Sequence, residues 1–293
     1  MRITMTGATG FIGSRIRAAL EAGGHELRLI SRRARAGFFS WPSLDTLPPV
    51  EALAGASAVI HLAGEPVAQR WTPEVKRRIR ESRVLGTSRL VEALERADPR
   101  PAVLVCASAT GYYGDRGEEV LDETSPPGQG FLAETCVEWE EAAAAAERFG
   151  LRVVRLRFGM VLGRDGGALK KMLPWFRLCL GGKIGSGQQW MPWIHVDDAA
   201  ELAVWALKEE AAAGAFNAVA PYPARNADFT RTLEGLLGRP ELFTIPPAAL
   251  RLVLGEGAEI ALASQRVLPR AALNAGFRFR YPALAEALRA LLS

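Results

Sequence analysis

The feature that most constrains this chain is the glycine pattern of Gly7-Ala8-Thr9-Gly10-Phe11-Ile12-Gly13. It follows an apolar segment at residues 2–5 and opens an amphipathic segment that reaches about residue 21. This order predicts a strand, a tight turn and a helix that together bind a dinucleotide. The first glycine allows the turn, the second lets backbone N–H groups approach a pyrophosphate, and the third lets the helix pack closely on the strand. The pyrophosphate then lies at the positive end of the helix dipole.

The end of the second predicted strand indicates which dinucleotide is bound. This strand, residues 25–30, is followed by Ser31-Arg32-Arg33. A protein that binds NAD usually has Asp or Glu here, about 20 residues beyond the glycine turn, to bind the ribose 2′-hydroxyl. Guanidinium groups instead offer charge and a planar fork of donors, which suit a phosphate. The sequence therefore predicts NADP(H); the alternative is that Arg32, Arg33 and Arg35 form a solvated basic loop.

Alternating strand and helix patterns predict an α/β fold, a doubly wound parallel Rossmann sheet with a smaller C-terminal substrate lobe. Strands are expected at residues 2–5, 25–30, 56–64, 101–108, 151–158 and 216–219. Helices are expected at residues 11–21, 73–83, on to 96, 131–148, about 199–210 and 226–237, with a flexible loop at 181–187. Residues 1–165 would form the dinucleotide-binding core, with its sheet completed by parts of 190–220. Residues 166–293 would mainly form the substrate lobe, including a small C-terminal domain at about 246–293.

Composition excludes several other classes of protein. A chain of 293 residues can bury a large core, and its net charge of +4 comes from scattered basic residues without aromatic interleaving, so we expect no nucleic-acid partner. The isolated Cys106, Cys136 and Cys179 indicate neither a disulfide framework nor a metal site, which fits a reducing cytoplasm. We see no signal peptide and no apolar stretch of membrane-spanning length, and therefore expect no membrane association. A homo-oligomer is compatible with the sequence.

Five ordered segments carry a resemblance to a known family: TGATGFIG, HLAG, ASATGYYG, RLRFGMVLG and PWIHVDD. In this order they resemble the extended short-chain dehydrogenase/reductase superfamily. With FLAETCVEWE, FNAVAP and the QRVLP…GFRFRYP tail, the chain is similar to an atypical branch of it, the SDR39U1-like or YfcH-type NAD-dependent epimerase/dehydratase proteins with a small C-terminal domain. The resemblance implies a bound nicotinamide dinucleotide and a substrate cleft between two lobes.

The resemblance also implies the cofactor contacts. They comprise the glycine turn, the end of the second strand, the loop after the third strand, one helical arginine and two residues near the nicotinamide. In order they are Gly7, Thr9, Gly10, Phe11, Ile12, Gly13, Ser31, Arg32, Leu62, Ala63, Gly64, Arg83, Met160 and Val161.

The chain departs from the superfamily at the catalytic Tyr-x-x-x-Lys. In the superfamily the Tyr transfers a proton, while the Lys binds the ribose and lowers the pKa of the Tyr. The corresponding helix here places Leu132 and Cys136 in these two positions, and no other Tyr-x-x-x-Lys occurs. An unassisted tyrosine with a pKa of about 10 is ionised in only about one molecule in a thousand at neutral pH. This departure argues against ordinary dehydrogenase or epimerase chemistry.

The remaining catalytic candidates are Ser108, Tyr112 and Tyr113. Ser108 ends its predicted strand and could polarise a substrate oxygen, and one tyrosine could stack on a ligand while the other donates a proton. The alternative for both tyrosines is packing. His195 could act as an acid or base, but the segment 193–198 more readily builds a strand-to-helix corner in which an aspartate caps the helix.

Two functions remain open. The sequence favours an NADP(H)-dependent oxidoreductase or epimerase that acts on a small polar, for example sugar-like, molecule. The alternative is an NADP(H)-binding redox sensor or partner-assembly protein with little or no catalysis. Residues near a plausible cleft mouth could recognise an anionic or sugar-like substrate or could be a solvated loop; these are Lys170, Lys171, Lys183, Gln188, Gln189 and Trp190.

Overall fold

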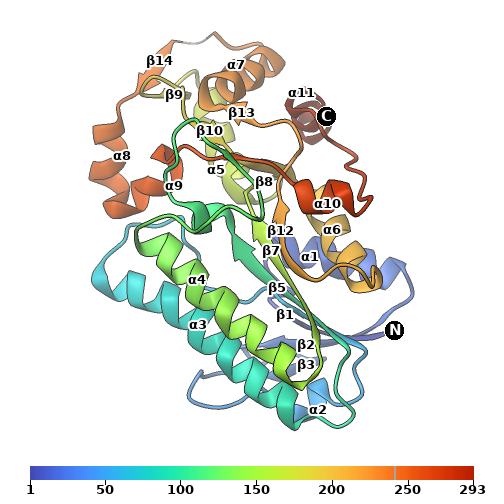
Figure 1. The fold of residues 1–293 in the computed structure, drawn as a ribbon. Coiled ribbons are helices and arrows are strands. Elements are labelled where there is room, and N and C mark those ends of the chain that lie inside the picture. Colours follow the sequence, from blue (N-terminus) through green and yellow to red (C-terminus); the bar gives the residue numbers. More distant parts are fainter. Residues whose placement is uncertain (241) are drawn as a thin grey trace.

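The computed structural model describes residues 1–240 and 242–293, and a seven-stranded sheet lies at its centre (Figure 1). The strand order is β12-β7-β5-β4-β1-β2-β3, and every pair of neighbours is parallel. The strands are β1 (Arg2–Thr6), β2 (Glu26–Ser31), β3 (Phe38–Ser40), β4 (Ala58–His61), β5 (Val103–Ala109), β7 (Arg152–Phe158) and β12 (Gly214–Ala218). The predicted α/β class with a parallel Rossmann sheet is confirmed. The order changes direction between β1 and β4, and open sheets of this kind bind ligands at the carboxyl ends of the strands beside such a point.

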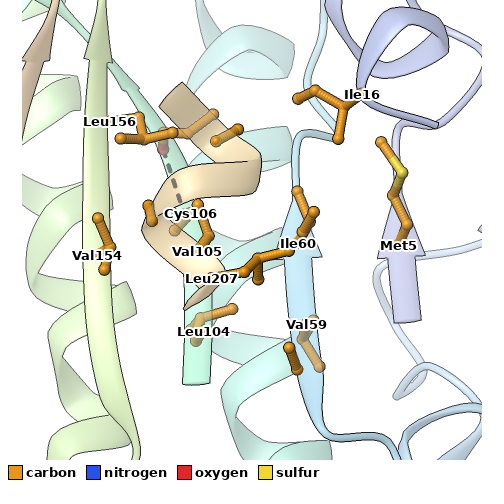
Figure 2. Packing of buried hydrophobic residues seen from close by; sticks show 14 of the residues in the cluster. Met5, Ile16, Val59, Ile60, Leu104, Val105, Cys106, Val154, Leu156 and Leu207 are labelled. Carbon is orange, nitrogen blue, oxygen red and sulfur yellow. Dashed lines mark hydrogen bonds between the residues drawn. The ribbon is translucent and has the colours of Figure 1, made fainter. Parts of the chain in front are cut away.

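Helices cover both faces of the sheet. The helices α1 (Phe11–Ala22) and α6 (Val196–Lys208) pack together on one face, and α3 (Pro73–Arg96) and α4 (Phe131–Ala144) pack together on the other (Figure 1). Since both faces are covered, the central strands are apolar along their length. Figure 2 shows this core, in which Met5, Ile60, Val105, Val154 and Leu156 are fully buried.

The remaining elements are short; most of them come from the second half of the chain and lie around the carboxyl ends of the sheet, whereas the helices at Val50–Leu53 and Ala145–Phe149 lead into β4 and β7 at its other end (Figure 1). The strands are β6 (Val120–Leu121), β8 (Met160–Leu162), β9 (Gly182–Ile184), β10 (Trp190–Met191), β11 (Trp193–His195), β13 (Ala224–Arg225), β14 (Phe243–Ile245) and β15 (Arg266–Val267). The helices are α2 (Val50–Leu53), η1 (Thr110–Tyr113), η2 (Ala145–Phe149), α5 (Gly167–Arg177), α7 (Asn226–Leu237), α8 (Pro247–Leu254), η3 (Glu256–Ala258), α9 (Glu259–Leu262), α10 (Arg270–Asn274) and α11 (Leu284–Leu292). None of the described helices combines the length and the apolar character needed to cross a bilayer.

Two expectations about local structure are wrong. The segment from residue 73 to 96 is one continuous helix, α3, whose first turn is capped by Thr72, which accepts a hydrogen bond from the Val75 N–H at 3.2 Å. It stays continuous because Ile79, Leu90 and Leu94 present one buried face along its length. The predicted flexible loop at 181–187 contains β9, which pairs with the distant β14. Its partner lies far along the chain, so a local pattern does not reveal the strand.

The C-terminal residues are fastened to α6. The buried Asp198 carboxylate accepts hydrogen bonds from the N–H groups of Arg280 and Tyr281 at 2.7 and 2.9 Å. Beside it, the ring of His195 lies 3.9 Å from that of Tyr281, centre to centre. The helix cap is the His195 side chain, which accepts from the Asp197 N–H at 3.1 Å, and not the predicted aspartate.

Candidate functional site

A cavity of about 660 Å³ lies at the carboxyl ends of the central strands. The glycine turn after β1 and the loop after β4 line one part of it. The ends of β5 and β7, helix α4, and residues 259–265 line the rest. The cavity therefore joins the predicted dinucleotide cradle to a second compartment covered by the C-terminal segment.

Each outer glycine of the turn is required by close backbone contacts. Gly7 has a φ of +72°, and a Cβ there would lie 2.7 Å from the carbonyl carbon of Leu62. A Cβ on Gly13 would lie 2.1 Å from the Gly7 oxygen, so the start of α1 packs directly on the turn. Gly10 stands between them as the residue before the first turn of α1. This cradle fits a dinucleotide, because a helix N-terminus with unobstructed N–H groups binds a pyrophosphate.

Most of the residues predicted to contact the cofactor line this cavity. They are Gly7, Gly10, Phe11, Ile12, Gly13, Leu62, Ala63, Gly64, Arg83, Met160 and Val161. Thr9, Ser31 and Arg32 are not part of the lining, and the Ser31 hydroxyl accepts a hydrogen bond from the Arg33 N–H at 3.2 Å.

Arg32 lies at the mouth of the cavity. Its side chain is 68% exposed, and its Nη1 is 4.0 Å from Oε2 of Glu65, which is a lining residue. An exposed guanidinium beside the cradle can turn toward a phosphate without leaving a buried partner unpaired. Its position is compatible with the 2′-phosphate contact that the sequence predicts.

Arg83 is the one cation among the lining residues in the described part of the chain. Its Nη1 donates to the backbone oxygens of Glu65 and Ile79 at 2.9 and 3.1 Å, and its guanidinium lies 5.1 Å from the ring centre of Trp139. Burial lowers the pKa of Arg83, although an arginine remains charged in proteins. A positive charge is thus held beside the loop after β4.

Ser108 lines the cavity, but its proton is directed into the protein. It is 3% exposed, and its Oγ donates to Glu140 Oε1 at 2.6 Å. Glu140 in turn forms two parallel hydrogen bonds with Arg157, at 2.8 and 2.9 Å. Burial alone would lower the pKa of Arg157, but its hydrogen bonds to Glu140 and the charge of that carboxylate raise it. Ser108 can therefore act toward the cavity only as a hydrogen-bond acceptor while this pair persists.

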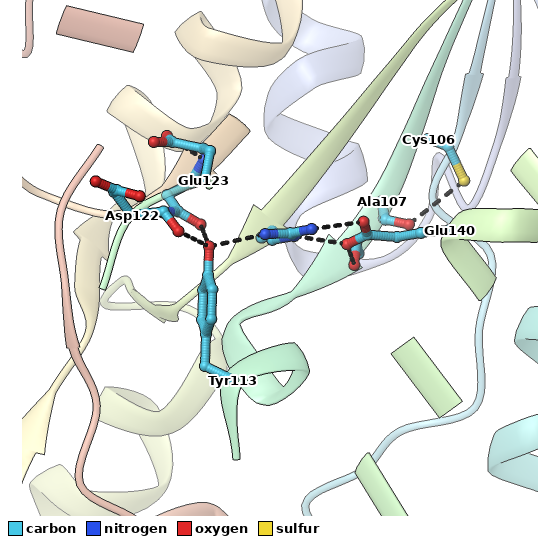
Figure 3. Close-up of polar contacts among 9 residues, drawn as sticks. Cys106, Ala107, Tyr113, Asp122, Glu123 and Glu140 are labelled. Carbon is cyan, nitrogen blue, oxygen red and sulfur yellow. Dashed lines mark hydrogen bonds and ion pairs between the residues drawn. The ribbon is translucent and has the colours of Figure 1, made fainter. Parts of the chain in front are cut away.

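Tyr112 and Tyr113 are not among the residues that line the cavity. Tyr113 is fully buried, and its hydroxyl accepts from Arg157 at 2.8 Å and lies 2.7 Å from Asn217 Oδ1 and 2.9 Å from the Asp122 oxygen (Figure 3). Burial raises the pKa of Tyr113 to about 12. Tyr112 packs edge-on against Tyr113 and lies under the Arg157 guanidinium. The geometry supports the packing alternative for both rings and gives no support to a catalytic hydroxyl.

Leu132 and Cys136 both line the cavity, so the two positions that superfamily members fill with Tyr and Lys do face the site. Burial raises the pKa of the Cys136 thiol to about 12, so the thiol is neutral at physiological pH. This wall of the site consequently carries neither a proton donor matched to neutral pH nor a cation.

Sequence reasoning missed several lining residues. Thr110 begins η1 directly after β5, and its hydroxyl has no hydrogen-bond partner among residues 1–240 and 242–293. The sequence could have indicated Thr110 as a site residue, because it follows the end of the same strand as Ser108. Glu259 and Gln265 reach the cavity from the C-terminal segment, where no local pattern marked them. Of the residues predicted at the cleft mouth, Trp190 lines the cavity, and the other five, all of them described, do not.

The sequence matches known protein families along most of the chain. The NAD dependent epimerase/dehydratase family matches residues 3–219, and a domain of unknown function (DUF1731) matches residues 245–291. The epimerase family protein SDR39U1 homolog, chloroplastic, of Arabidopsis thaliana is 42% identical over 302 residues, which cover 100% of this chain and 87% of that protein.

Solved structures are similar over the same extent. The human epimerase family protein SDR39U1, isoform 2, crystallised with NADPH, has a TM-score of 0.91 at 36% identity and covers 99% of both chains. MoeE5 in complex with UDP-glucuronic acid and NAD has a TM-score of 0.77 at 25% identity, covering 98% of this chain and 96% of that one. These neighbours support a nicotinamide cofactor.

Proposed function

Because this chain belongs to the NAD dependent epimerase/dehydratase family, we propose that it is an NADP(H)-dependent oxidoreductase or epimerase that acts on a small molecule. The observation that carries the proposal is the single cavity that joins the glycine cradle to a second compartment beyond the end of β5. A cofactor in the cradle and a substrate in that compartment would meet beside Met160 and Val161. The NADPH of the human relative supports the choice of the phosphorylated cofactor.

Different residues would bind different parts of the cofactor. The turn from Gly7 to Gly13 would hold the pyrophosphate at the N-terminus of α1, and Arg32 would bind the 2′-phosphate at the cavity mouth. Arg83 would place its charge beside the loop after β4. When bound, the cofactor supplies a hydride from its reduced ring or accepts one at its oxidised ring.

Thr110 is the residue best placed to donate a hydrogen bond to the reacting oxygen of the substrate. Its hydroxyl lacks a partner within the described residues, whereas the Ser108 proton is held by Glu140. Ser108 would accept a hydrogen bond from the substrate or the ribose. In this arrangement Ser108 stays in the site as an acceptor, and the predicted role of polarising the substrate oxygen passes from Ser108 to Thr110.

The alternative is an NADP(H)-binding redox sensor, and one observation favours it. Leu132 and Cys136 leave the site without the pair that normally transfers the proton. In that case cofactor binding would be tight and turnover absent.

A cytoplasmic location and a homo-oligomeric state remain predictions.

Cofactor titration followed by turnover measurements on a carbonyl panel tests the proposal. We expect NADPH to bind and to be oxidised. Thr110→Val should lower kcat by at least about tenfold and leave the Kd for NADPH unchanged, because valine has the same shape but cannot donate the hydrogen bond to the substrate. Tyr112→Phe is the matched control, since it removes a hydroxyl outside the cavity lining, and its kcat should stay within about twofold. Tight NADPH binding without turnover of any substrate would favour the sensor, and an unchanged kcat in Thr110→Val would remove that residue from the mechanism.

A further inference from the structure

The compartment beyond the cofactor cradle has an apolar lining. It lies between α4, α5, β10 and residues 259–265, and we call it the substrate compartment. Leu132 and Cys136 contribute one wall, Met172 and Met191 a second, and Ile260 the cover. These side chains can bind a ligand by burial of apolar surface but offer little to a hydroxyl-rich one.

The polar side chains of the substrate compartment are mostly bonded to the protein already. Asn226 accepts from a backbone N–H of β9 at 2.7 Å, and Gln265 donates to a backbone carbonyl at 2.8 Å. Trp190 directs its indole N–H at Glu118, at 2.9 Å. Among the described residues, the groups left for a ligand are the Thr110 hydroxyl, the Glu259 carboxylate and two acceptor oxygens, Ser108 Oγ and Gln265 Oε1.

The charge of the compartment is unfavourable for an anion. Arg83, the one lining cation of the described residues, lies at the cofactor cradle, and the charged side chain within the substrate compartment is the acidic Glu259. Arg225 and Arg266 lie over the Trp190 ring, 4.3 and 4.8 Å from its centre, but neither belongs to the lining, and Arg225 is paired with Glu118. An enclosed anion without a cationic partner loses its hydration without compensation.

From this lining we infer that the substrate is an uncharged, largely apolar carbonyl compound, or the corresponding alcohol, and not a nucleotide sugar or a carboxylate. The inference rests on the proposed function and differs from the polar, sugar-like substrate that the sequence predicts. Thr110 would bind the single reacting oxygen, while the methionine and leucine side chains surround the carbon skeleton. In the reducing direction the carbonyl carbon would receive a hydride from bound NADPH and its oxygen a proton from water, so the products would be an alcohol, NADP⁺ and hydroxide.

Two carbonyl compounds that differ by a single carboxylate test the inference. The full chain is first titrated with NADPH, and the oxidation of NADPH is then followed with phenylacetaldehyde and with phenylpyruvate. We expect kcat/KM to be at least about tenfold higher for the neutral aldehyde, because the carboxylate finds no cation in the compartment. Binding of 2-phenylethanol, 3-phenyllactate and UDP-glucose to the NADP⁺ complex, measured by calorimetry, provides a readout that does not require turnover. We expect the neutral alcohol alone to bind.

Charge-reversal variants test whether Glu259 causes the preference for the neutral aldehyde. Glu259→Lys should shift the preference toward phenylpyruvate by at least about tenfold. Glu286→Lys on α11 makes the same charge change at an exposed position and should leave the preference unchanged.

The outcomes separate the two proposals. Equal or better use of phenylpyruvate, binding of UDP-glucose to the NADP⁺ complex, or no binding of 2-phenylethanol would each overturn the inference while the cofactor assignment stands. Failure of NADPH to bind would instead contradict the proposed function. Binding of the neutral alcohol without turnover of either carbonyl would support the substrate class and contradict catalysis.

Discussion

Individual side chains decide which cofactor this chain can select. Arg32 occupies the place where a carboxylate would accept hydrogen bonds from an unphosphorylated ribose, and its guanidinium is exposed at the mouth of the cavity. The sequence alone could not distinguish a phosphate contact from a solvated basic loop. In the structure Arg32 lies 4.0 Å from Glu65, which belongs to the cavity lining, and this position supports the proposed phosphate contact.

We predict that Arg32→Ala weakens binding of NADPH far more than binding of NADH. The expected loss for NADPH is about 1.5 to 3 kcal/mol, or roughly ten- to 150-fold in Kd, because charged hydrogen bonds to the phosphate disappear. The Kd values are measured by fluorescence titration of both cofactors. Arg35→Ala is the matched control, an exposed arginine of the same loop whose removal should change neither Kd by more than about twofold. An equal loss for both cofactors in Arg32→Ala would contradict the phosphate contact.

At the scale of elements, the site depends on how α1 and α4 are fixed to the sheet. The start of α1 touches the turn after β1 so closely that no side chain fits at Gly13. Helix α4 is joined to β5 and β7 by the buried chain of hydrogen bonds from Ser108 through Glu140 to Arg157. A buried charge pair of this kind is costly to break, because removal of one partner leaves the other without compensation. It therefore holds the α4 wall of the cavity in place.

We predict that Gly13→Ala abolishes cofactor binding and lowers the melting temperature. The added Cβ would lie 2.1 Å from the Gly7 oxygen. This atom and the next nearest, in Gly7 and Ala8, belong to the backbone, so the turn and α1 must separate. Gly235→Ala in α7 is the matched control. Within the described part of the chain no atom lies within 4 Å of its added Cβ, and alanine in a helix should stabilise the protein by about 0.5 to 1 kcal/mol. Differential scanning calorimetry and NADPH titration measure the two effects. Retained NADPH affinity in Gly13→Ala would show that the turn tolerates expansion.

In the whole molecule, N-terminal and C-terminal segments of the chain meet around the cavity. The cradle comes from the first residues of the chain, and the cover comes from residues 259–265. Beyond the cover, the chain is tied to α6 by Asp198, which is fully buried and accepts hydrogen bonds from two backbone N–H groups. Burial raises the pKa of Asp198, which the two hydrogen bonds oppose by stabilising the carboxylate.

We predict that Asp198→Ala loosens the C-terminal segment and lowers the free energy of unfolding by about 1 to 3 kcal/mol, since it removes a fully buried acceptor and leaves two part-buried backbone donors unpaired. Hydrogen exchange should rise most in residues 277–292. Asp165→Ala is the matched control, because Asp165 is 78% exposed and its ion pair with Arg15 spans 3.5 Å, so its loss should cost less than about 1 kcal/mol. Unchanged exchange in the C-terminal residues of Asp198→Ala would show that other contacts hold them.

The part of the fold that the sequence predicted is the part encoded by local patterns. Period-two and buried strand patterns located β1, β2, β4, β5, β7 and β12, and a helical pattern located α7 at the bounds that the structure shows. The glycine spacing predicted the cradle because the positive φ of Gly7 and the contact of Gly13 with Gly7 both arise within the turn itself, whereas the approach of Leu62 to Gly7 is a tertiary contact. The short pairs β9–β14 and β6–β15 were missed, since each joins segments that are far apart in the chain.

The sequence by itself determined the α/β order, the dinucleotide cradle and the loss of the Tyr-x-x-x-Lys pair, because each is encoded by residues that are neighbours along one element. Only the tertiary structure decided which side chains face the substrate. It directed the Tyr113 hydroxyl and the Ser108 proton into the protein and left the Thr110 hydroxyl without a partner among the described residues. It also brought Glu259 and Gln265 to the cavity. The physical reason is that orientation and burial depend on partners such as Glu140, Arg157 and Asn217, which come from separate elements and meet only when the chain has folded.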